Sequence, residues 1–132
     1  MKKILLDTNA YVRFLRGDEQ VMAYLAQADQ VYMSVFVLGE LYAGFKAGSK
    51  NRENRQILEK FLLKPTVTIL EASTETADIF GLLAASLRKS GTTIPINDVW
   101  IAAHALETGS LLITYDDHFT MIPGVRLWDR IA

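Results

Sequence analysis

Short apolar runs alternate with longer amphipathic segments along the whole chain, and this alternation restricts the possible folds more than any other feature. The expected strands are residues 3–6, 31–33, 67–70, 111–114 and, more weakly, 125–127. Each is a brief apolar run bounded by polar or turn-forming residues. Strands that alternate with helices predict an α/β fold, in which helices cover both faces of a parallel sheet.

Helix start and stop signals divide the segments between these strands. Thr8 and Asn9 can cap a helix over residues 10–15, which breaks at Gly17 and resumes over residues 21–28, because their side chains can accept from free N–H groups. Ser34 is the expected cap of the next helix. The remaining helices are expected over residues 52–63, 73–89 and 98–108.

The chain has 132 residues, of which 50% are hydrophobic and 22% are charged. This size and composition suit one folded domain over residues 1–132. Cysteine is absent, which excludes disulfides and thiolate-bound metals and fits the cytoplasm. Asp7 interrupts the apolar start too early for an export signal, and no run approaches the ~20 apolar residues of a membrane helix. We therefore expect a cytoplasmic protein with no membrane segment.

Acidic residues recur where a parallel sheet would place a ligand, beyond the carboxyl ends of its strands. Asp7 follows the first strand, and Asp116 and Asp117 follow the fourth. Glu40 lies in the helix after the second strand, among apolar neighbours, and Asp98 opens the helix that leads into the fourth strand. Clustered carboxylates repel one another unless cations neutralise them. Since Mg²⁺ prefers carboxylate oxygens, the pattern predicts a divalent-metal site.

Each acid also has a structural interpretation. An Asp after a strand is often a cap or a turn former, and an Asp in a first helical turn, such as Asp98, suits the helix dipole. Glu40 is harder to explain in this way, because Glu is rarely buried without a partner. The net charge of −1 means that any contact with a nucleic-acid backbone must be local or carried by bound cations.

Four segments together resemble the PIN-domain ribonucleases, and in particular the toxins of VapBC-type toxin–antitoxin pairs. The segments are Leu5–Asn9, Val37–Leu41, Ile96–Ala103 and Leu112–Phe119. The resemblance spans nearly the whole chain. It implies a three-layer α/β/α fold with a mostly parallel five-stranded sheet. It also implies an endoribonuclease that depends on Mg²⁺ or Mn²⁺ and is inhibited by a cognate antitoxin in a type II toxin–antitoxin system, with RNA as substrate and a homodimer as the expected assembly.

Carried over position by position, the resemblance assigns the catalytic and metal-binding roles to Asp7, Glu40, Asp98 and Asp116. Three further residues are expected to support them. Thr114 matches the polar residue of the fourth motif and is a candidate for orienting a metal-bound water or a phosphate, and Asn9 is expected beside the acids. Because the spacing of this motif varies, Asp117 could share or replace the role of Asp116, which we favour.

Other polar residues are weaker candidates. His104 lies six positions after Asp98, about 240° around a helix, so it is expected to face elsewhere. His118 lies beside the acidic turn and could touch phosphate, although packing or capping is the simpler interpretation. Arg13 and Arg16 could contact RNA phosphates or an antitoxin carboxylate, or simply lie on the surface.

Three rival functions have distinct requirements. A PIN-type RNA-processing nuclease would need no antitoxin. A phosphotransfer domain with Asp7 as nucleophile normally has a second Asp two positions later, where this chain has Asn9. A non-catalytic RNA- or protein-binding domain would not need all four acids.

Overall fold

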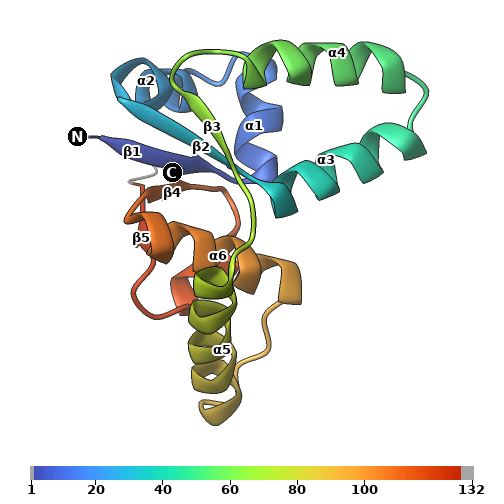
Figure 1. The fold of residues 1–132 in the computed structure, drawn as a ribbon. Helices are drawn as coiled ribbons and strands as arrows, with labels where there is room; N and C mark the ends of the chain where they lie inside the picture. Colours follow the sequence, from blue (N-terminus) through green and yellow to red (C-terminus); the bar gives the residue numbers. More distant parts are fainter. Residues whose placement is uncertain (1, 129–132) are drawn as a thin grey trace.

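A computed structural model describes residues 2–128 and shows five strands in one parallel sheet, in the order β3-β2-β1-β4-β5 (Figure 1). The strands are β1 (Lys3–Leu6), β2 (Gln30–Ser34), β3 (Val67–Leu70), β4 (Leu111–Ile113) and β5 (Arg126–Leu127). The α-helices are α1 (Thr8–Leu15), α2 (Glu19–Gln27), α3 (Val35–Ala47), α4 (Asn51–Leu62), α5 (Thr74–Lys89) and α6 (Ile96–Thr108). A 3₁₀ helix, η1, spans Asp117–Met121. The predicted α/β architecture is confirmed.

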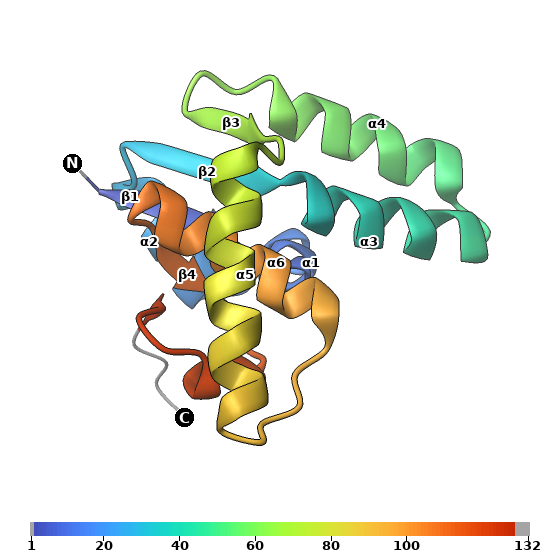
Figure 2. The ribbon, with the colours of Figure 1, turned by 60° about the horizontal axis from the view of Figure 1, so that its bottom comes forward.

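The central strand β1 pairs in parallel with β2 on one side and β4 on the other, so that Leu5 lies opposite both Tyr32 and Leu112. Helices α1 and α2 pack on one face of the sheet, and α5 and α6 pack on the other (Figures 1 and 2). Right-handed crossovers require this arrangement, because the chain moves from β1 through β2 to β3 and then reverses to β4. Because β1 is buried between two helical layers, it is apolar at every position from Ile4 to Leu6.

The α3–α4 pair extends past the carboxyl end of β2 and away from the sheet (Figure 1). Ser34 caps α3 by accepting a hydrogen bond from the Phe36 backbone N–H, as predicted. Helix α3 buries Val37, Leu38 and Leu41, so one of its faces is fixed against the core and the rest of the helix can border a site.

The starts of α1 and α6 differ from the prediction, whereas the end of α6 agrees with it. Asp7 caps α1 in place of the predicted Thr8 and Asn9, because its carboxylate accepts the first free N–H of the helix. Helix α6 starts at Ile96, two positions before the predicted start at Asp98. Gly109, with φ at +67°, ends α6 in the left-handed conformation that glycine adopts without strain. None of the helices in residues 2–128 combines the length and the apolar character needed to cross a bilayer.

Candidate active site

The strand order reverses between β1 and β4, and ligands of open parallel sheets bind beyond the carboxyl ends of the strands at such a reversal. A pocket of about 300 Å³ lies there. It is lined by Asp7, Thr8, Asn9, Val12, Arg13, Arg16, Glu40, Asp98 and Asp116. The four acids that the sequence singled out therefore meet in one hollow, although they come from four separate elements of the chain.

The supporting residues divide into three cases. Asn9 lines the pocket with the acids. Thr114 does not line the pocket but is buried beside Asp7, and the Thr114 hydroxyl donates to Oδ2 of Asp7 at 2.7 Å. Asp117 begins η1, is exposed and does not line the pocket. The placement therefore favours Asp116 over Asp117 as the acid contributed by the fourth motif.

Asp7 is held rigidly by neutral donors. Its Oδ1 accepts from the backbone N–H of Thr8 at 2.8 Å, and its Oδ2 accepts from the Thr114 hydroxyl and from Nδ2 of Asn9 at 3.3 Å. The backbone N–H of Asp116 donates to the Thr114 oxygen at 3.0 Å, which leaves the hydroxyl proton directed at Asp7. Asn9 is oriented in turn, because its Oδ1 accepts from the Tyr115 backbone N–H at 2.9 Å. Thr114 and Asn9 therefore position the Asp7 carboxylate.

The surroundings of Asp7 oppose its ionisation. Burial raises the pKa of Asp7 to about 6, against the lowering effect of the Thr114 and Thr8 hydrogen bonds. The nearby carboxylates of Asp98 and Glu40 add to the increase. Burial, followed by the charge of Asp116, also raises the pKa of Asp98. A site that makes two carboxylates reluctant to lose their protons is suited to an external cation.

Glu40 lines the pocket as an exposed residue, which its sequence neighbours did not suggest. Its apolar neighbours predicted a buried side chain, but the residue is exposed, because the buried face of α3 is formed by Val37, Leu38 and Leu41. Its Oε1 accepts from the Thr8 hydroxyl at 2.7 Å. The side chain is thus held at the pocket wall by α1, and Thr8 is a supporting residue that the sequence analysis missed.

His118 lies at the acids, whereas the sequence analysis placed it beside the acidic turn and favoured packing or capping. Its Nδ1 lies 3.0 Å from Oδ1 of Asp116 and 3.4 Å from Oδ2 of Asp98, while about half of its side chain stays exposed. The backbone N–H of His118 also donates to Oδ1 of Asp116 at 2.9 Å. The signal for this placement was its position two residues after Asp116, in a turn where Asp116 caps η1.

His104 is a core residue, as its position relative to Asp98 predicted. It is fully buried, and its ring nitrogens lie 2.8 Å from the Ser34 hydroxyl and 3.2 Å from the Glu71 carbonyl oxygen. Burial lowers the pKa of His104. A neutral imidazole with both nitrogens engaged has no proton-transfer role at the acids.

The donor set fits a hard divalent cation. In residues 2–128 no lysine or arginine forms an ion pair with any of the four carboxylates. Asp98, Asp116 and His118 each offer one ligand atom, and these three atoms lie within 4.8 Å of one another. Carboxylate oxygens predominate, as Mg²⁺ and Mn²⁺ sites require. The acids are thus clustered with His118 as their one ion-pair partner among the described residues, and a bound divalent ion would relieve the remaining repulsion.

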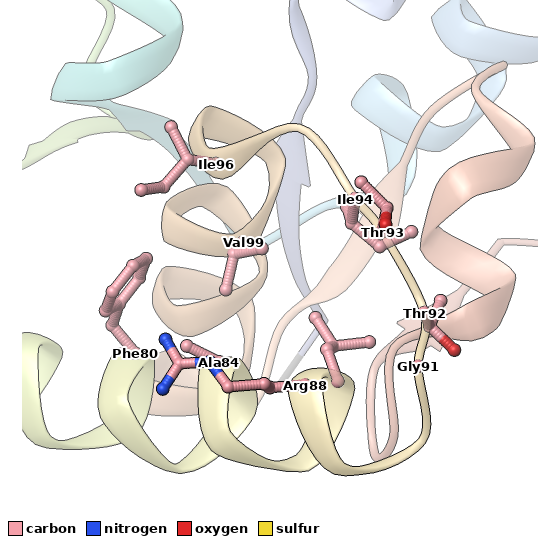
Figure 3. A pocket seen from close by; sticks show the side chains of 10 residues that line it. Phe80, Ala84, Arg88, Gly91, Thr92, Thr93, Ile94, Ile96 and Val99 are labelled. Atoms are coloured by element: carbon pink, nitrogen blue, oxygen red, sulfur yellow. The ribbon is translucent and has the colours of Figure 1, made fainter.

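A larger hollow, of about 470 Å³, lies between α5 and the segment that leads into α6 (Figure 3). Its lining is mostly apolar, with Phe80, Leu87 and Val99, and Arg88 is its one charged side chain. It contains no carboxylate. The acidic pocket is therefore the better candidate for chemistry, although it is the smaller of the two.

Comparison with known proteins agrees with this geometry. The model of the PIN domain family matches residues 4–125. The chain therefore belongs to the PIN domain family, and the resemblance noted in the sequence is confirmed. It is similar to Ribonuclease VapC2 of Haemophilus influenzae, with 34% identity over 116 residues, which is 86% of each chain.

Two solved structures share the fold over nearly the full length. One is VapBC of Salmonella typhimurium bound to DNA, with a TM-score of 0.86, 27% identity and 98% of each chain covered. The other is VapBC2 of Rickettsia felis bound to a DNA fragment from their promoter, with a TM-score of 0.84 and 28% identity. That match covers 96% of this chain and 99% of the other. The fold as a whole thus has counterparts in both VapBC structures.

Proposed function

We propose that this chain is a metal-dependent endoribonuclease, with residues 1–132 as one nuclease domain, and that Asp7, Glu40, Asp98 and Asp116 hold Mg²⁺ or Mn²⁺. The observation that carries the proposal is the buried Asp7 carboxylate, which has only neutral hydrogen-bond donors and faces three further acids. The similarity to a protein named a ribonuclease supports RNA as the substrate class.

The protein's contribution is mainly geometric. Thr114 and Asn9 fix Asp7, Thr8 fixes Glu40, and the start of η1 fixes Asp116. The phosphate of the substrate would lie in the pocket that these carboxylates border. When bound, the ion supplies an acidified water and neutralises charge on the reacting phosphate and the leaving oxygen. His118 remains half exposed beside two of the acids, and there is no second histidine at the pocket for paired acid–base catalysis.

The first prediction concerns the metal. Purified protein should cut total cellular RNA in Mg²⁺ or Mn²⁺ and should lose this activity completely in EDTA, because uncompensated carboxylates would repel the phosphate. Activity should return when the metal is added in excess of the chelator. Melting curves in both buffers would show whether the protein stays folded. Full cleavage in EDTA by folded protein would refute the proposal.

We further propose that the chain is the toxin of a type II pair and that a cognate antitoxin inhibits it in the cytoplasm. The two VapBC structures, which match nearly all of the chain, support this role. A homodimer, expected from the family resemblance, stays a prediction.

A further inference from the structure

Two arginines lie on the wall of the acidic pocket, and the proposed metal site gives them no role. Arg13 on α1 and Arg16 at its C-terminal cap follow Asn9 by four and seven positions, so all three side chains project from one side of the helix. Within the described part of the chain, these arginines are the only cationic side chains that line the pocket. Each is exposed and accessible to a ligand.

Another hollow, of about 330 Å³, adjoins the acidic pocket. Its lining consists of Arg13, Arg16, Gly17 and Asp18. The two hollows share both arginines, so the surface leads from the acids, past the guanidinium groups, to the corner between α1 and α2. A strand with its scissile phosphate at the acids would pass these groups with a neighbouring phosphate.

Arg13 is held in place by its neighbours. Its guanidinium carbon lies 3.9 Å from the centroid of the Tyr115 ring, which is a cation–π contact. The Tyr115 hydroxyl donates to Oδ2 of Asp18 at 2.7 Å, while Oδ1 of Asp18 caps α2 by accepting from the backbone N–H groups of Gln20 and Val21. This arrangement fixes the guanidinium plane and so reduces the entropy that binding a phosphate would cost.

From these contacts we infer that Arg13 and Arg16 form a subsite for the RNA phosphate next to the scissile bond, and that Tyr115 and Asp18 position Arg13 for it. The inference rests on the proposed ribonuclease function. It explains how a chain with a net charge of −1 and an acidic site can hold a polyanion: the metal compensates the acids, and the arginines bind the strand.

The test measures binding of a short, fluorescein-labelled, single-stranded RNA by anisotropy, in Mg²⁺, with the protein made inactive by Asp7→Asn. Arg13→Ala and Arg16→Ala should each weaken binding roughly tenfold, since each removes a charge-assisted hydrogen-bonding group. Each should also reduce the slope of log K against log salt by about 0.7, the value for one phosphate contact on a single strand. Arg88→Ala, which removes an exposed arginine from α5 on the opposite face, should change neither.

Two further variants separate positioning from charge. Arg13→Lys keeps the charge but loses the planar guanidinium, so it should recover only part of the binding. Tyr115→Phe keeps the ring and removes the hydroxyl bound to Asp18; it should weaken binding less than Arg13→Ala and should have no effect when Arg13 is already Ala. In the active background, Arg13→Ala should raise KM and leave kcat nearly unchanged.

The results distinguish the subsite from the nuclease itself. If Arg13→Ala and Arg16→Ala, both shown to be folded by melting curves, bind RNA as tightly as the parent and with the same salt slope, the subsite is wrong. Cleavage by the unaltered chain that EDTA abolishes would leave the proposed function intact in that case. If the unaltered chain neither cuts nor binds RNA in Mg²⁺, the proposed function fails and the subsite fails with it.

Discussion

Replacing Asp7 by Asn should abolish RNA cleavage and, at the same time, make the metal-free protein more resistant to heat at pH 8. The loss of activity should be on the order of 10³-fold or more, since the variant removes a carboxylate at the position where the metal and the reacting phosphate meet. The gain in stability has a separate origin. The ionised form of Asp7 is disfavoured by burial and by the neighbouring acids, and Asn carries no charge.

The stability gain should depend on pH in a defined direction. The pKa of Asp7 rises from its ordinary 3.8 to about 6 on folding, so the folded protein binds this proton more tightly than the unfolded chain. That contribution to stability is complete below pH 4 and is lost as the pH rises through 6, at a cost of up to about 3 kcal/mol. Asp7→Asn removes this cost. Part of the gain in stability is offset, because Asn accepts the hydrogen bonds made to Asp7 less well.

The measurement is the difference in Tm between Asp7→Asn and the unaltered protein in EDTA, across pH 4 to 8. The variant should gain several degrees at pH 8, since about 1 kcal/mol corresponds to roughly 4 °C in a chain of this size, and little or nothing at pH 4. Adding Mg²⁺ should then stabilise the unaltered protein much more than the variant. The matched control is Asp78→Asn, which changes an exposed Asp on α5. A lower Tm for Asp7→Asn at every pH would show that Asp7 is chiefly a structural cap.

Expression of the unaltered chain alone in a bacterial host should stop growth, and co-expression with the product of an adjacent antitoxin gene should restore it. An endoribonuclease with no inhibitor would degrade RNA that the cell needs. Asp7→Asn, expressed to the same level, should leave growth normal without any antitoxin. The measurement is colony formation on inducing plates, with immunoblots to show equal protein. Normal growth with active enzyme in the cells would favour an RNA-processing nuclease that works without an antitoxin.

Much of the fold follows from local signals in the chain. Each predicted strand and helix is present, because short apolar runs and caps such as Ser34 act within a few residues. The strand order was not predictable in this way. It depends on the face of the sheet that each helix covers, and therefore on packing between α5 and α6 and between α1 and α2.

The same distinction applies to the site. Asp7 and Asp116 were predicted because residues that follow parallel strands meet at one edge of the sheet. The exposure of Glu40 depends on which face of α3 packs against the core, and its apolar neighbours did not reveal this. The position of His118 two residues after Asp116 was, in contrast, a local signal for its contact with that acid. The contact between Arg13 and Tyr115 joins residues about a hundred positions apart. It depends on the pairing of β1 with β4, which brings the segments that follow these strands together.

If Asp7, Glu40, Asp98 and Asp116 hold the ion, water would attack the phosphate and the RNA strand would be cut without using its own 2′-hydroxyl. The most direct test is cleavage, in Mg²⁺, of an RNA oligonucleotide that carries a single 2′-deoxy nucleotide at the scissile position, followed by mapping of the ends by ligation. Water attack in line with the 3′ oxygen predicts that this substrate is cut and that the products carry 5′-phosphate and 3′-hydroxyl ends. A substrate that binds normally but is not cut, or a 2′,3′-cyclic phosphate on the unmodified RNA, would contradict the mechanism.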